Sequence, residues 1–121
     1  FFFLLKSTTL IISLFLSSCS NEVIINDKLS ISRWNDEGYS LQFNDEESWL
    51  GIVRPDITSY DLQNNILILE RAYKNESTEY YLINLDSLNK PKDLTDSSLT
   101  KKQFQNKINR LGINYKPKKL K

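Results

Sequence analysis

Two periodicities divide this chain. Between residues 29 and 85, apolar and polar residues alternate in short runs, a period of two that is typical of half-buried β-strands. Leu29–Arg33 and Tyr39–Phe43 alternate most clearly, and a polar stretch ending in Gly38 separates them. This pattern predicts a β-hairpin whose turn uses a positive φ at Gly38.

Further strands are expected along the middle of the chain, in residues 49–53, 57–62, 66–73 and 78–85. Pro55 closely follows the first of these runs, so that strand should be short or lie at a sheet edge. Asn64-Asn65 predicts a turn. The last two runs are rich in β-branched and aromatic residues, which favours a central hairpin covered on at least one face.

The helical period appears after residue 99. Thr100 and Gln103 have the spacing of a capping box, in which each side chain bonds the other residue's backbone N–H. Leu99 and Phe104 stand where a hydrophobic staple would join them. These signals predict that a helix begins directly after Thr100.

The helix is predicted to end at Leu111. Phe104, Ile108 and Leu111 share one face, Gly112 suits a left-handed C-cap, and Ile113 can then contact Ile108. A three-turn helix is marginal alone and has to pack on other structure. The predicted fold class is therefore α+β: a small antiparallel β-sheet of about four to six strands with one C-terminal amphipathic helix packed on it.

The N-terminal segment has a different character. Phe1–Leu16 is apolar apart from Lys6 and a few Ser and Thr residues, and it leads into Leu16-Ser17-Ser18-Cys19. Export signals combine a positive region, an apolar run of roughly 7 to 15 residues and small residues before the cleavage site. The segment resembles the lipobox signal peptide of bacterial membrane lipoproteins. The resemblance implies a diacylglyceryl group on the Cys19 thiol, cleavage before Cys19 and acylation of the new amine, with palmitate as the typical acyl chain.

Two other interpretations of this segment are weaker. A transmembrane anchor needs roughly 20 apolar residues, and a span that started at Phe1 would bury the charge of Lys6. A buried core helix with an ordinary thiol at Cys19 would suit the length, but the segment has no polar face and precedes a polar shift. The chain starts with Phe and has no Met, so we expect its start codon and further basic residues to be missing.

These patterns predict four parts. Residues 1–18 form a signal peptide that is removed, and residues 19–27 form the lipidated cysteine and its tether. Residues 28–113 form a single α+β domain, because removal of the signal leaves enough chain for one small core. Residues 114–121 form a basic tail that is expected to be disordered.

The composition excludes several kinds of chemistry. The chain has no histidine and one cysteine, so it lacks Ser-His-Asp and Cys-His arrangements, histidine-containing zinc sites and intramolecular disulfides. No cofactor or metal site is predicted. A calcium site at Asp45-Glu46-Glu47 is less favoured than a solvated turn. The carboxylates that could act in sugar hydrolysis are weak candidates: Asp36, Glu37, Asp45, Glu46 and Glu47. Trp34, Trp49 and the six tyrosines could stack on a sugar, but a small domain without disulfides needs most of its aromatic residues for the core.

Charge is balanced overall but divided along the chain. Residues 19–86 contain 13 acidic and 5 basic side chains, whereas residues 87–121 contain 2 acidic and 10 basic ones. We expect the two halves either to pair within the fold or to leave a basic face for acidic partners and anionic lipid head groups. Local pairing on solvated faces is the simpler expectation.

The order of a lipobox, several strands and a closing helix resembles small uncharacterised bacterial lipoproteins. The resemblance implies an envelope location and an α+β domain, without an activity. We therefore expect a non-catalytic, lipid-anchored binding module outside the cytoplasm, attached to the cell membrane or outer membrane through Cys19. Its expected partners are the membrane and an envelope protein or polymer, and not nucleic acid. The alternative is a protective protein against a toxin or lytic enzyme; an enzyme ranks third.

Overall fold

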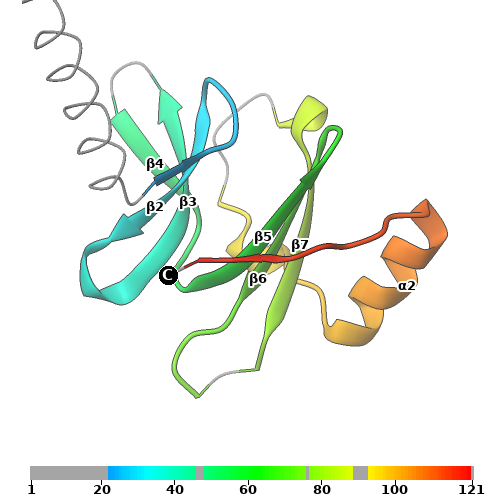
Figure 1. Ribbon diagram of the computed structural model, residues 1–121. Helices are drawn as coiled ribbons and strands as arrows, with labels where there is room; N and C mark the ends of the chain where they lie inside the picture. The colour runs from blue at the N-terminus through cyan, green and yellow to red at the C-terminus, as the bar shows by residue number, and fades with distance from the viewer. Residues whose placement is uncertain (1–21, 46–47, 76, 89–92, 121) are drawn as a thin grey trace, which may run out of the picture.

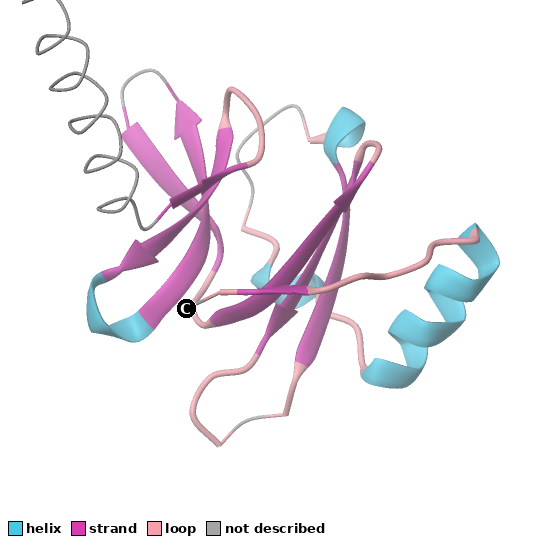
Figure 2. Cartoon of the chain, viewed as in Figure 1, coloured by secondary structure: helices cyan, strands magenta, loops and turns pink. Residues whose placement is uncertain are grey.

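The computed structural model describes residues 22–45, 48–75, 77–88 and 93–120, which form three layers (Figure 1, Figure 2). The N-terminal sheet has the order β1-β2-β3-β4, and the C-terminal sheet has the order β7-β6-β5-β8. Neighbouring strands are antiparallel in both sheets. The helix α2 (Lys101–Leu111) covers the outer face of the C-terminal sheet. The α+β class with a packed C-terminal helix is confirmed.

The strands agree closely with the sequence periodicity. In the N-terminal sheet they are β1 (Glu22–Ile24), β2 (Leu29–Trp34), β3 (Gly38–Asp45) and β4 (Ser48–Val53). In the C-terminal sheet they are β5 (Ile57–Gln63), β6 (Ile66–Arg71), β7 (Glu79–Asn84) and β8 (Lys118–Lys119). Short 3-10 turns occupy Asn35–Glu37, Leu85–Ser87 and Thr95–Ser97. The strands are thus shared between two stacked sheets, whereas the sequence predicted one.

The predicted hairpin is present as β2 and β3. Leu29 pairs with Phe43 and Trp34 pairs with Gly38. Gly38 has a φ of 109°, and a Cβ added there would collide with the Asp56 carboxylate. That carboxylate accepts a hydrogen bond from the Tyr39 N–H at 3.0 Å. Glycine is needed here because both the backbone angle and the close approach exclude a side chain.

The main core lies between the two sheets. Its buried side chains come from both sheets: Leu29, Ile31, Leu41, Phe43, Ile52, Val53, Ile57, Leu67, Leu69, Tyr81 and Ile83. Leu67 and Leu69 of β6 belong to this core, while Ile68 between them faces α2. The continuous apolar run of β6 follows from this position, because both of its faces are covered.

A second, smaller core lies between the C-terminal sheet and α2. Ile68, Phe104 and Ile108 are buried there. The Tyr80 ring stacks on Phe104 with centroids 4.5 Å apart, and the Tyr115 ring meets Phe104 edge-on at 5.3 Å. Phe104 is therefore held between one aromatic ring from β7 and one from the chain that follows the helix.

Both predicted caps of α2 are confirmed. The Gln103 N–H donates to Thr100 Oγ1 at 3.2 Å, and the Thr100 N–H donates to Gln103 Oε1 at 2.9 Å. Gly112 adopts a left-handed φ of 68°, and the Ile113 N–H donates to the Ile108 carbonyl at 2.9 Å. Leu111 differs from expectation, since it is 52% exposed. The helix buries Phe104 and Ile108, and Leu111 lies past their contact with the sheet.

The expectation of a disordered tail is wrong for residues 114–120. After α2 the chain crosses the outer face of the C-terminal sheet and adds β8 to its edge, where Lys119 pairs with Ser59. Leu120 packs against the main core, and its N–H donates to the Thr58 carbonyl at 3.0 Å. The tail is ordered because β5 presents an open edge with unpaired backbone groups.

Residues 22–25 belong to the folded domain, whereas the sequence placed them in the tether at residues 19–27. Glu22–Ile24 pairs with β2, with Val23 opposite Ile31. Val23 and Ile25 pack against the main core. Cys19 and the rest of residues 1–21 lie outside the described residues. Within the described part of the chain, no helix combines the length and apolar character needed to cross a membrane.

Candidate functional site

A buried arginine closes one end of the main core. Arg71 is 9% exposed, and its Nη1 lies 3.0 Å from Glu79 Oε2. Its Nε donates to the carbonyls of Arg54 and Pro55, both at 2.9 Å. Those carbonyls belong to the connection between the two sheets. Arg71 therefore fastens the sheets together, and its bonds account for it as a structural residue.

Tyr81 belongs to the same group of polar side chains. Its hydroxyl donates to Glu79 Oε2 at 3.0 Å. Burial, and then this hydrogen bond to a carboxylate, raise the pKa of Tyr81. The phenol stays protonated and acts as a donor, which suits a structural bond and not a base.

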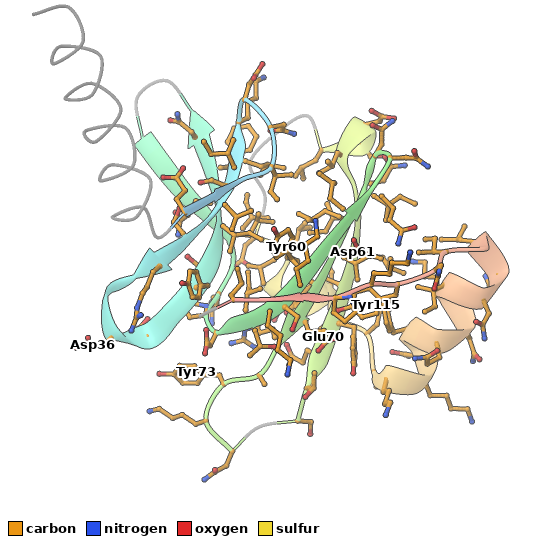
Figure 3. All side chains as sticks on the ribbon, in the orientation of Figure 1. Asp36, Tyr60, Asp61, Glu70, Tyr73 and Tyr115 are labelled. Atoms are coloured by element: carbon orange, nitrogen blue, oxygen red, sulfur yellow. The ribbon has the colours of Figure 1, made fainter. Side chains whose placement is uncertain are left out.

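A second polar group lies on the face of the C-terminal sheet that α2 covers. Asp61 of β5 is buried, and its Oδ2 accepts hydrogen bonds from Gln63 Nε2 and from the Lys116 N–H, both at 2.8 Å. Glu70 of β6 accepts a bond from the Tyr115 hydroxyl at 2.6 Å. Figure 3 shows Asp61, Glu70 and Tyr115 close to the strand-like C-terminal segment.

These bonds hold the C-terminal segment on the sheet. Gln63 Nε2 also donates to the Asn114 carbonyl, so Asn114, Tyr115 and Lys116 are each bonded to β5 or β6. Burial, followed by the bond to Glu70 and its charge, raises the pKa of Tyr115. Burial and the Glu70 charge also raise the pKa of Tyr80. Both phenols are neutral at physiological pH, and the two carboxylates accept hydrogen bonds from the chain itself.

The helix before this segment carries a surface that we call the basic layer. It consists of the exposed basic side chains of α2: Lys101, Lys102, Lys107 and Arg110. No acidic residue follows Asp96 in the sequence. Among the described residues, ion pairs join Arg54 to Asp93 and Arg71 to Glu79, and none involves the basic layer.

The basic layer resolves the question of how the divided charge is used. Local pairing of the two halves was the simpler expectation, yet these cations have no acidic partner in the described part of the chain. Lys118 of β8 lies apart from this layer, because its Nζ is 5.8 Å from the centre of the Tyr60 ring and Tyr60 packs against the main core. An unpaired basic surface attracts anionic groups, and its attraction is screened by salt.

A hollow of about 640 Å³ adjoins this layer where β7 meets the start of α2. Residues 77–80 and 98–101 line it, and they include the hydroxyls of Ser77, Thr78 and Ser98 with the cation of Lys101. Glu79 also lines the hollow, and its carboxylate is bonded to Arg71 and to the Tyr81 hydroxyl. Leu99 closes it by pairing with Tyr80, with N–H to carbonyl distances of 3.0 and 2.7 Å. The hollow offers hydrogen-bond donors beside positive charge.

The structure does not bring the predicted carboxylates for sugar hydrolysis together. Asp36 and Glu37 precede β3, whereas Asp45 ends that eight-residue strand. A strand of this length spans roughly 24 Å at about 3.4 Å per residue, far beyond the 5 to 9.5 Å that glycosidase pairs require. Glu46 and Glu47 lie outside the described residues. No group of three potential metal ligands occurs in the described ranges.

Some of the aromatic candidates for sugar stacking are instead used in packing. Tyr81 is in the main core, and Tyr80 and Tyr115 pack on Phe104. The side chains of Trp34 and Trp49 lie outside the part that the structure describes. Sequence reasoning had treated the basic residues after Gly112 as a tail, and it missed that Lys118 and Lys119 form β8 on the edge of the C-terminal sheet. It also missed that the cations of α2 stand without acidic partners among the described residues. The absence of acidic residues after Asp96 was the available signal.

Comparisons with known protein families, with curated proteins and with solved structures found no match for this chain.

Proposed function

We propose that this chain is a lipid-anchored binding module of the bacterial cell envelope, with the basic layer as its binding surface. The observation that carries the proposal is Leu16-Ser17-Ser18-Cys19 at the end of an apolar run. Two acyl chains or more give stable membrane attachment, whereas a single chain binds reversibly. A lipidated Cys19 would keep the domain at the membrane surface outside the cytoplasm.

The position of β1 supports this arrangement. Only Ser20 and Asn21 separate Cys19 from Glu22, where β1 begins. Three residue steps of extended chain reach about 10 Å at most. A lipid on Cys19 would therefore hold the N-terminal sheet close to the membrane and restrict how far the domain can move from it.

The basic layer supports a binding role. Its cations are exposed, have no acidic partner among the described residues and stand on a helix that is capped at both ends. A surface of this kind gains favourable interactions when an anionic partner arrives, and opposite charge speeds the encounter. The two stacked sheets beneath it give that surface a rigid support.

The test of the anchor is mass spectrometry of the protein made in a bacterial host. We expect an N-terminal peptide that begins at Cys19 and carries acyl chains, and we expect the protein in the membrane fraction. Cys19→Ala should abolish both, and Ser20→Ala is the matched control that should retain both. An unmodified Cys19 inside a longer peptide would refute the lipid anchor.

A further inference from the structure

The basic layer and β1, the strand that follows the expected lipid anchor, lie at opposite sides of the domain. β1 is an edge strand of the N-terminal sheet, whereas α2 covers the far face of the C-terminal sheet. Figure 1 shows these layers in order, with β1 in blue at one side and α2 in orange at the other. Stacked sheets lie about 10 Å apart, and a helix adds about 10 Å. The basic layer is thus about 20 Å from the N-terminal sheet.

The charges follow the same axis. The N-terminal sheet and its turns have an excess of negative charge, since their exposed acidic side chains outnumber the exposed cations Lys28 and Arg33: Glu22, Asp27, Asp36 and Glu37. The basic layer carries only positive charge. The charge of the domain is therefore unevenly distributed: one side is acidic and the other is basic. The acidic side is next to the expected anchor.

We propose that the basic layer binds an acidic segment of a second envelope protein, on the side of the domain that faces away from the membrane. The orientation rests on the proposed lipid anchor at Cys19, whereas the acidic chemistry of the partner rests on the layer itself. A short anchor holds the acidic side near the membrane. Anionic head groups about 20 Å away are then beyond the screening length of about 8 Å at physiological ionic strength.

The packing of α2 favours a protein partner over a lipid surface. A helix that lies in a membrane inserts its apolar face into the bilayer. In α2 that face is occupied, because Phe104 and Ile108 are buried against the C-terminal sheet. The remaining exposed apolar side chain, Leu111, stands next to Arg110 and one turn from Lys107. One leucine among cations suits a mixed apolar and acidic peptide contact.

The hollow at the start of α2 would fix the direction in which a bound acidic peptide lies along the helix. Acidic side chains accept hydrogen bonds, and the hollow presents donors from Ser98, Thr78 and Lys101. A carboxylate that entered there would gain bonds as well as charge attraction. The binding should therefore prefer carboxylate peptides that can place one residue in the hollow and the next ones along the helix.

The experiment measures binding of a fluorescein-labelled peptide of ten glutamates to the full chain, as purified in neutral detergent, by fluorescence anisotropy. The triple variant Lys102→Gln/Lys107→Gln/Arg110→Gln removes part of the basic layer. The matched control Lys28→Gln/Arg33→Gln/Lys74→Gln changes the net charge equally at exposed positions outside it. We expect Kd to rise about tenfold in the first variant and less than about twofold in the second. Equal losses would overturn the proposal, because net charge alone would explain the binding.

A second arm separates a protein partner from a membrane. The lipidated chain is inserted into vesicles of phosphatidylcholine alone or with phosphatidylglycerol, and the same peptide is titrated. Similar peptide affinity in both vesicles is expected if the layer faces away from the bilayer. Loss of peptide binding on the anionic vesicles would show that the layer lies on the membrane and would overturn the proposal. The detergent measurement needs no lipid on Cys19, so failure of the anchor is detected separately by the mass of the N-terminal peptide.

Discussion

The two faces of the C-terminal sheet are held by different means. The inner face packs large apolar side chains against the N-terminal sheet, and six residues from that sheet join five from its own strands in one core. The outer face has only Ile68, Phe104 and Ile108 buried in its apolar cluster. Hydrogen bonds that Asp61 and Glu70 accept from the C-terminal segment complete that face. The comparison indicates that the inner face determines the stability of the fold, and the outer face positions the basic layer.

Strand β5 explains the difference. Its register shifts between Ile57 and Ser59, so Ile57 packs in the main core while Ser59 and Asp61 lie on the outer face. Polar groups that are buried need hydrogen-bond partners. Asp61 obtains them from Gln63 and from the chain after α2. The outer face therefore needs the C-terminal segment in order to satisfy its own polar residues.

The largest expected effect is in the main core. Leu69→Ala should lower the free energy of unfolding by about 4 kcal/mol, because it leaves a cavity where a fully buried side chain contacted both sheets. Urea denaturation followed by circular dichroism measures this loss. Ile24→Ala is the control, since Ile24 is 74% exposed and should change stability by less than about 0.5 kcal/mol. A loss below about 1 kcal/mol for Leu69→Ala would contradict the assignment of the main core.

Phe104→Ala should cost about 3 kcal/mol, the lower end for a buried phenylalanine, because the outer core is small and α2 can separate from the sheet. Hydrogen exchange provides the sharper measurement. Amides of α2 should exchange much faster in the variant, while those of β2, β3 and β6 stay protected. Uniform acceleration through both sheets would show that the two faces form one cooperative unit.

Tyr115→Phe should lower stability by about 1.5 to 3 kcal/mol, because it removes a hydrogen bond to a charged acceptor and leaves Glu70 without that donor. The pKa of Tyr115 is raised in the folded state, so the folded protein holds this proton more tightly than the unfolded chain. The stabilisation is complete below the unfolded pKa of about 10 and declines as pH rises above it. Thermal melts from pH 8 to 11 should show a smaller alkaline loss in the variant. An identical decline in both proteins would refute this role.

The smallest expected effect is at the start of α2. Thr100→Ala should cost about 1 kcal/mol, because the Gln103 N–H loses its cap. Thr100→Ser keeps the hydroxyl and should behave nearly as the wild type. Urea denaturation distinguishes the two variants. If both variants lose the same amount, the methyl group of Thr100 matters and the cap does not.

The elements that the sequence determined by itself are those whose causes lie within a few residues. Gly38 was identified from the polar turn between two alternating runs, and the limits of α2 followed from Thr100, Gln103 and Gly112. Turn angles, caps and the two periodicities involve neighbours along the chain, so they can be recognised without knowing the fold.

The tertiary structure alone decided how these elements combine. The strands divided into two sheets because β4 and β5, separated by residues 54–56, entered different layers. Pro55 indicated that the strand before it is short or lies at an edge, but no local signal shows that the next strand joins a second sheet. The residues after Gly112 contain lysines and Pro117 and have no strand pattern of their own. They became ordered because Asp61, Glu70 and the edge of β5 offered bonding groups that exist together only after the C-terminal sheet has formed. Such long-range contacts depend on which distant residues meet in space. A local sequence pattern does not specify those contacts.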